Sequence, residues 1–407
     1  MVNNLRIWLK DTTHKLFSSI GFYPALIALS FLVLSWLSIS FDFSESGMNF
    51  KSQLKWISLN DATTARSIIS AITAGIISLT VFSFTMVMIV LNQTASQMSN
   101  RILDQLIGGR FQQVVLGIYI GTILYALFLL STIRDIDSGI RIPALSTYLL
   151  ILLTILNLFL FIYFLHFITQ SVKYAVIIKK ITDETQEILN KERPLLIPPA
   201  LANTFNFEYK LEAKNSGIYQ GFSKHILINI CDQLNCTIFL IYKPGTFILK
   251  GTPIALIDKP FMDEKKDELI NAIYIHAHES IEENFIYGFK LLKEVAIKAL
   301  SPGINDPGTA VQCIRSLFKL FVFSICHYQH DILLNHEKQI RIITKNITFD
   351  EIFKETILPI WDYGKNDWLI QNELHHLILQ LQQIKNSDIA YSLLTLVNTK
   401  INERTIG

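Results

Sequence analysis

Charged side chains are scarce in this chain, and their scarcity excludes several classes of protein. Asp, Glu, Lys and Arg make up 17% of the 407 residues and hydrophobic residues make up 50%, whereas soluble globular chains carry about 25% charged residues. Disordered chains combine low hydrophobicity with high charge, so the composition excludes disorder and disfavours a wholly soluble protein. The near balance of 36 basic and 34 acidic side chains offers no bulk attraction for nucleic acid, and no nucleic-acid partner is expected.

Catalytic and metal-binding motifs are also missing. The sequence contains no P-loop, dinucleotide-binding fingerprint, nucleophile elbow, zinc-protease motif or kinase signature, and no nucleophile and base stand out as a pair. The four cysteines are Cys231, Cys236, Cys313 and Cys326. The first two have four residues between them, and a zinc knuckle has two. We therefore expect no cofactor and no metal, and an enzyme is the least favoured class.

Four long runs contain no charged residue: 16–41, 67–100, 111–133 and 142–172. A charge at the centre of a membrane helix costs about 2.5 to 3.5 kcal/mol on insertion scales, and about 20 apolar residues cross the hydrocarbon core. We therefore predict four transmembrane spans at 20–40, 68–91, 112–133 and 146–169. The apolar stretch of the first run, 23–39, exceeds the usual core of a signal peptide, so we expect an uncleaved anchor.

The flanks of these spans predict the orientation. Lys and Arg favour the cytoplasmic side of short loops. Eight of them flank one side (Arg6, Lys10, Lys15, Arg101, Arg110, Lys173, Lys179, Lys180) and five flank the other (Lys51, Lys55, Arg66, Arg134, Arg141). Both termini are predicted to be cytoplasmic, and the cysteines are then expected to be reduced thiols.

The second and third spans carry patterns of small residues. In the second, Ala71, Gly75, Ser78, Thr85 and Asn92 recur at intervals of three, four or seven and share one helix face. Two interpretations stay open: close packing against another helix, or the lining of a polar path. The third span has Gly117-x3-Gly121, which predicts close helix packing within or between chains.

The rest of the chain is predicted to be a cytoplasmic α+β domain. A helical extension and Pro-rich linker occupy 173–199, with an apolar stripe (Tyr174, Ile177, Ile178, Ile181, Leu189) that needs a partner, which another subunit could supply. A β-rich segment follows at 200–260, with a hairpin turn predicted at Pro244-Gly245. Residues 261–407 are predicted to be helical, beginning with one long helix over 263–300. The predicted domain before these segments is the transmembrane domain, residues 1–172.

The segment GTFILKGTPIALIDK in the β-rich part resembles the half-barrel repeat of lipoyl and biotinyl carrier domains. The resemblance implies a small barrel-like fold. It does not extend to lysine modification, because Lys259 precedes a proline and follows Gly251 too closely.

A corner with the sequence SPGINDP separates 263–300 from the next helix. Asp306 and Pro307 are typical of an N-cap and first helical position. The corner is either a simple link between helices or a binding site for a polar ligand group, formed by Ser301, Gly303, Asn305 and Asp306 at a helix N-terminus. Asp306 makes an anionic ligand less favourable, because its own carboxylate would accept hydrogen bonds from the free N–H groups of the helix N-terminus. Further on, Thr348-x-x-Glu351 predicts a capping box.

Several segments together resemble the bacterial membrane proteins of domain of unknown function 2254: ARSIIS (65–70), FSFT (82–85), SQMSNRIL (96–103), VVLGIYIGTILYALFLLSTIR (114–134), SGIYQGF (216–222), PGTFILKGTPIA (244–255) and ALSPGINDPGTAVQCI (299–314). The resemblance implies a bacterial inner membrane and no particular activity. The chain departs from the family at Ser99-Asn100-Arg101, where Ser-Pro-Arg is usual. It departs again at Glu279-Ser280 and Asn284, where an Arg-Thr pair and an Asp are usual.

Two functions from different classes follow. The first is an oligomeric channel or transport-type protein with a cytoplasmic sensing or gating domain, in which the second span lines a polar path. The second is a membrane-anchored regulatory module that binds its ligand at the SPGINDP corner. The lipid bilayer and a second copy of the chain are the expected partners.

Overall fold

The computed structural model describes residues 21–53, 61–97, 110–133, 142–171, 173–191, 206–261, 263–327 and 332–406. The chain divides into two compact units, with the change at Lys173 and Tyr174. We call them the N-terminal unit and the C-terminal unit. The first is helical, and the second combines helices with two small sheets.

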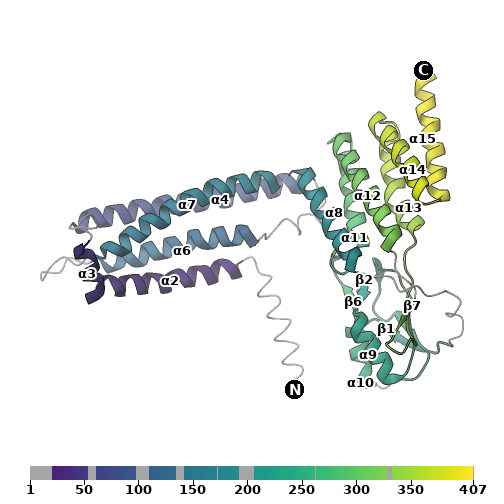
Figure 1. Ribbon diagram of the computed structural model, residues 1–407, viewed down its shortest axis with the longest axis horizontal. Coiled ribbons are helices and arrows are strands. Elements are labelled where there is room, and N and C mark those ends of the chain that lie inside the picture. The colour runs from purple at the N-terminus through teal and green to yellow at the C-terminus, as the bar shows by residue number, and fades with distance from the viewer. Residues whose placement is uncertain are drawn as a thin grey trace. The chain divides into compact units, whose positions relative to one another are not determined.

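Four long helices run side by side in the N-terminal unit (Figure 1). They are α2 (Phe22–Asp42), α4 (Ala62–Gln97), α6 (Arg110–Thr132) and α7 (Ala144–Ser171), with the short α3 (Glu45–Gln53) after α2. Each of the four is long and apolar enough to cross a membrane, and each overlaps one predicted span. A fifth helix of that kind is α12 (Pro307–His327), which belongs to the C-terminal unit.

Helix α6 occupies the centre of the N-terminal unit. Two clusters of buried side chains join it to α4 and α7. In the first cluster Ile69 of α4 and Leu150 of α7 pack with Tyr125 of α6; in the second, Ile76 and Phe164 pack with Tyr119. Helix α6 is therefore covered on several sides, while the outer faces of α2, α4 and α7 carry most of the exposed large apolar side chains of this unit.

Asp42, at the end of α2, is fully buried and ties three elements together. One carboxylate oxygen accepts hydrogen bonds from the backbone N–H and the hydroxyl of Ser146, at 2.8 and 2.9 Å. The other oxygen is 2.6 Å from Nζ of Lys51 in α3. Because Ser146 lies in the first turn of α7, Asp42 caps that helix from another helix, where a negative charge is favoured.

The C-terminal unit contains a bundle of six helices: α8 (Tyr174–Lys191), α11 (Ile286–Ala299), α12, α13 (Phe349–Gly364), α14 (Trp368–Ile384) and α15 (Asp388–Ile406). Helix α12 packs against α8, α11, α13 and α14. The apolar stripe of α8 is buried against α11 and α12, so its partner lies in the same chain. Gly288 permits this contact, because a Cβ there would lie 1.8 Å from Oγ1 of Thr185.

The strands form two separate sheets. The larger has the order β1 (Tyr209–Glu212), β5 (Pro253–Ile257), β3 (Ile238–Leu240), β8 (Ile340–Ile343), β7 (Ile332–Leu334), and the smaller has the order β4 (Thr246–Ile248), β2 (Gly217–Phe222), β6 (Ile273–His276). All pairs are antiparallel except β3 with β8. Among the described strands no barrel closes. Strands from beyond residue 260 complete both sheets.

The hairpin predicted at Pro244-Gly245 is wrong. Gly245 does turn the chain, with a φ of +87°, but β3 and β4 on either side of it enter different sheets. The N–H of Gly245 donates to the carbonyl of Tyr219 in β2, and β4 continues that pairing with β2. The turn therefore carries the chain from one sheet to the other.

The single helix predicted over 263–300 is also wrong. The structure has α10 (Asp263–Asn271), then β6, then α11. Strand β6 pairs with β2, and the side chain of Gln220 in β2 holds the residues that follow: its Nε2 donates to the carbonyl of His278 and its Oε1 accepts from the N–H of Ser280. These distant partners override the local helical pattern.

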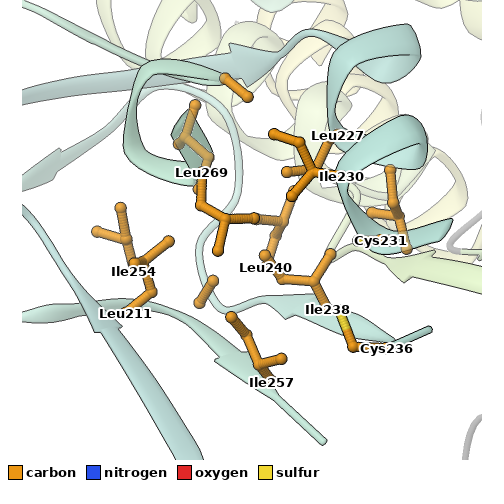
Figure 2. Close-up of a cluster of buried hydrophobic side chains, with 14 of the residues drawn as sticks. Leu211, Leu227, Ile230, Cys231, Cys236, Ile238, Leu240, Ile254, Ile257 and Leu269 are labelled. Carbon is orange, nitrogen blue, oxygen red and sulfur yellow. The ribbon is translucent and has the colours of Figure 1, made fainter. Parts of the chain in front are cut away.

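Side chains from both sheets, α9 (Lys224–Leu234) and α10 form one buried core (Figure 2). Leu227 of α9 and Leu269 of α10 are fully buried, as is Ile257 of β5. Cys231 and Cys236 belong to the same core. The interaction between their thiols raises the pKa of Cys231 and lowers the pKa of Cys236.

Replacing Asp42 should destabilise the N-terminal unit strongly. Asp42→Asn removes the charge that pairs with Lys51, because the remaining amide oxygen can accept from Ser146 while the amide nitrogen cannot accept from Lys51, and breaking a buried pair costs about 3 to 5 kcal/mol. The measurement is unfolding of the purified full chain in micelles by titration with a denaturing detergent. Glu45→Gln, at an exposed position three residues on, is the control and should change little. Equal losses in the two variants would contradict the anchoring role of Asp42.

The predicted capping box at α13 is confirmed, and it carries an ion pair that predicts a pH effect. Glu351 lies 2.5 Å from Nζ of Lys243. The hydrogen bond from Lys243, followed by that from the Thr348 backbone, lowers the pKa of Glu351 below its ordinary 4.5. Its stabilising contribution is therefore complete above about pH 4.5 and is lost as the pH falls through the lowered value.

Glu351→Gln tests this, because glutamine keeps the capping hydrogen bond but not the charge. The variant should be slightly less stable than the wild type at pH 7, and the gap should close on acidification below pH 4.5. Chemical denaturation at several pH values measures it. A gap independent of pH would show that the ion pair contributes nothing.

Candidate functional site

The small-residue face of α4 points away from the other helices of its unit. Ala71, Gly75, Ser78, Thr85 and Asn92 are all exposed, and a Cβ added to Gly75 would meet no heavy atom within 4 Å. The buried residues of α4 lie on another face. Within the part of the chain that the structure describes, the predicted face has no helix against it.

The hydroxyls on this face are satisfied by their own helix. Oγ of Ser78 donates to the carbonyl of Ala74 at 3.0 Å, and Oγ1 of Thr85 donates to the carbonyl of Val81 at 2.8 Å. These bonds allow the hydroxyls to lie in an apolar environment, and their free lone pairs still accept hydrogen bonds from water. The face therefore suits either another helix or a wet surface.

Gly117 and Gly121 bring α6 close to α2. A Cβ at Gly117 would lie 2.9 Å from Cδ1 of Ile27, and one at Gly121 would lie 2.7 Å from Cγ of Phe31. The two glycines thus pack against a helix of the same chain, and their missing side chains allow the approach.

The SPGINDP corner is an exposed link between α11 and α12 whose polar groups mostly serve the link itself. Oγ of Ser301 donates to the carbonyl of Lys298, and the carboxylate of Asp306 accepts from both the N–H and the hydroxyl of Thr309. Asn305 has a left-handed backbone with φ of +49°. Gly303 is exposed. Asp306 occupies the helix N-terminus, which leaves it unsuited to an external anion.

The start of α8 lies close to this corner. Burial raises the pKa of Tyr174, and the charges of Asp306 and then Cys313 raise it further. The corner is thus part of the α8, α11 and α12 packing.

The positions at which the chain departs from the family pattern do not meet at the corner. Glu279, Ser280 and Asn284 precede α11, whereas the corner follows it, and the helix between them spans about 20 Å. Glu279 forms an ion pair of 2.9 Å with Lys290, and Ser280 is bound by Gln220. Residues 99–101 lie outside the described part of the chain.

Two features were missed by sequence reasoning. The first is Asp42. Its position directly after a charge-free run could have marked it as a charge at the end of a span, but its partner Ser146 is 104 residues away and no local pattern identifies it. The second is a cavity of about 280 Å³ between α4, α6 and α7, into which the buried side chains of Ser83 and Tyr119 project. Both residues lie in the family-like segments, but nothing local marks them as neighbours.

In the described ranges, no three His, Cys, Asp or Glu side chains gather as a metal site. Cys231, Cys236 and Cys313 are buried free thiols, and the side chain of Cys326 lies outside the described part. His276 pairs with Glu283 at 2.9 Å.

The two types of glycine predict opposite responses to alanine. Gly121→Ala forces the Phe31 ring to shift, and overpacking of this kind costs about 1 to 3 kcal/mol. Gly75→Ala adds a methyl group in open space, where alanine is the better helix former, and should cost nothing. Thermal unfolding of the full chain in one detergent compares them. The packing assignment fails if Gly121→Ala is as stable as Gly75→Ala.

Comparison with known proteins agrees with this architecture. A family model described as "Predicted membrane protein (DUF2254)" matches residues 18–380. Uncharacterized proteins of Mycobacterium bovis and Mycobacterium tuberculosis are each 23% identical over 269 residues, which is 62% of this chain and 51% of theirs. The chain thus matches about half the length of these relatives. No solved structure matches it. Because the family model covers most of the chain, the protein belongs to the DUF2254 family of predicted membrane proteins.

Proposed function

We propose that the protein is a homo-oligomeric channel or transport-type protein of the bacterial inner membrane, with the C-terminal unit as a cytoplasmic sensing or gating domain. The observation that carries the proposal is the exposed small-residue face of α4. It combines an open notch at Gly75 with the hydroxyls of Ser78 and Thr85.

Four membrane spans, α2, α4, α6 and α7, are part of the proposal. The fifth apolar helix, α12, is better suited to a protein core. Arg315 of α12 makes two hydrogen bonds of 2.8 Å with Glu373 of α14. The ring of Phe321 contacts Phe289 of α11, and the rings of Phe318 and Phe321 both contact Phe353 of α13. The apolar surface of α12 is thus already matched by neighbouring helices, so lipid is not needed to cover it.

The orientation proposed is with both termini in the cytoplasm. The bias of Lys and Arg between the flanks supports it. The Asp42–Lys51 pair and the start of α7 then lie at the opposite membrane surface, where Lys51 reaches water from a partly exposed position. An interfacial position lowers the cost of placing this ion pair in the membrane.

The α4 face supports oligomerisation for a steric reason. One helix face cannot enclose a path, and α4 presents this face outward, so any path that it lines is enclosed by more than one copy. Small residues allow close approach of helices, and hydroxyls already bonded to their own backbone tolerate both protein and water. The alternative, a regulatory ligand site at the corner, is less well supported because Ser301 and Asp306 use their polar atoms internally.

Cysteine accessibility tests the wet path. We expect Ser78→Cys and Thr85→Cys in otherwise wild-type protein to react with a charged, membrane-impermeant thiol reagent in proteoliposomes, because water reaches them. Leu158→Cys, at an exposed position near the middle of α7, is the lipid-facing control and should not react. The wild-type chain sets the background from its own thiols.

Flux of ions and small solutes through the same proteoliposomes tests transport itself. Loss of flux in Ser78→Leu, with Asn305→Ala unaffected, is the expected result. Absence of any flux under every gradient would reject the channel. A strain that lacks the protein would be complemented with each variant. Failure of Asn305→Ala to restore the phenotype of that strain, with Ser78→Leu restoring it, would favour the regulatory alternative.

A further inference from the structure

The cavity between α4, α6 and α7 has the composition of a site for a neutral, lipid-soluble molecule. Its volume is about 280 Å³, close to the lower end of about 300 Å³ for small-molecule pockets. The lining has no charged side chain and comes from three helices: α4 supplies Ser83, Phe84, Val87 and Met88, α6 supplies Tyr119, and α7 supplies Phe164.

Two buried hydroxyls in this cavity lack the bonds that other hydroxyls in the unit make. Ser83 is 3% exposed and Tyr119 is fully buried. The two groups interact with each other, but within the described residues neither forms a hydrogen bond of ordinary geometry. Thr80 and Thr122, by contrast, donate to carbonyls of their own helices at 2.7 and 2.8 Å. A buried polar group left unpaired costs about 1 to 3 kcal/mol, so a bound oxygen atom would be favoured.

The position of the cavity indicates how a ligand would enter. Tyr119 lies nine residues into α6, or about 14 Å along its axis, which is near mid-depth of a hydrocarbon core of about 30 Å. Phe84 and Met88 of the lining are 55% and 44% exposed, so the cavity opens between apolar side chains at the surface of the unit, and neither residue belongs to the small-residue face of α4. A molecule dissolved in the bilayer has direct access.

We propose that this cavity binds a neutral, bilayer-dissolved molecule whose carbonyl oxygen accepts hydrogen bonds from Tyr119 and Ser83. A single oxygen between the two hydroxyls would satisfy both donors. The aromatic side chains of Phe84, Tyr119 and Phe164 suit a planar ring, and the size suits a head group whose tail stays in the lipid. Two sources have this chemistry: the ring carbonyl of a quinone and the ester carbonyl of a neutral glycerolipid. The site does not depend on the proposed channel.

Binding to the full chain in nanodiscs tests the site with three probes: a decyl-substituted benzoquinone, a short-chain diacylglycerol and decylbenzene, which has no oxygen. Equilibrium gel filtration against empty nanodiscs measures saturable binding. We expect one carbonyl probe to bind at one site per chain at least tenfold more tightly than decylbenzene. Tyr119→Phe and Ser83→Ala should each weaken that probe severalfold and leave decylbenzene unchanged. Whichever carbonyl probe shows this dependence identifies the source.

Tyr125→Phe is the matched control. Tyr125 is a buried tyrosine of the same helix, but its hydroxyl bonds to Ser38 and Ser146 outside the cavity, so probe binding should not change. Val87→Phe, which fills the cavity and keeps both hydroxyls, should abolish binding of all probes. The proposal is overturned if no carbonyl probe exceeds decylbenzene, or if Tyr125→Phe weakens binding as much as Tyr119→Phe.

Discussion

In hydrocarbon, a polar group without a hydrogen-bond partner is costly, and this requirement accounts for much of the N-terminal unit. Asp42 is placed on the first turn of α7 and beside Lys51, so that its buried charge is matched on both oxygens. Hydroxyls along the helices return to carbonyls one turn earlier. Nδ2 of Asn157 in α7 reaches Oγ1 of Thr122 in α6. The bonds of Asp42 and Asn157 also join neighbouring helices to one another.

Where the requirement is met inside a helix, the outer surface of that helix is free for other uses. The α4 face shows this, because Ser78 and Thr85 already have acceptors and remain exposed. Where a buried hydroxyl has no hydrogen-bond partner, as at Ser83 and Tyr119, the structure has an adjoining cavity. The two proposals therefore rest on different consequences of one constraint.

The C-terminal unit is organised by contacts between distant segments. Strands β1 to β6 alternate between the two sheets along the chain, and after α12 the chain adds β8 beside β3 and β7 at the edge of the larger sheet. Helix α8, which directly follows the N-terminal unit in sequence, is held by α11 through the Thr185 and Gly288 contact. Helix α8 is therefore fixed within the C-terminal unit by a helix that lies more than 100 residues further along the chain.

The sequence by itself determined the features that depend on local composition. Charge-free runs located α2, α4, α6 and α7, because burial of charge in hydrocarbon is costly at any position. The capping box at Thr348 and Glu351 and the corner at Asp306 were readable because a helix N-terminus exposes unpaired N–H groups that nearby side chains satisfy. The Gly117-x3-Gly121 spacing predicted close approach without identifying the partner helix.

Only the tertiary structure decided which segments meet. It divided 263–300 into a helix, a strand and a helix. The strand forms because the backbone of β2 pairs with it and the side chain of Gln220 binds the residues that follow, and the local pattern cannot reveal either partner. It separated β3 and β4 into different sheets, placed Asp42 on Ser146, and turned the small-residue face of α4 outward. Each outcome depends on partners tens of residues away, and local periodicity carries no information about that distance.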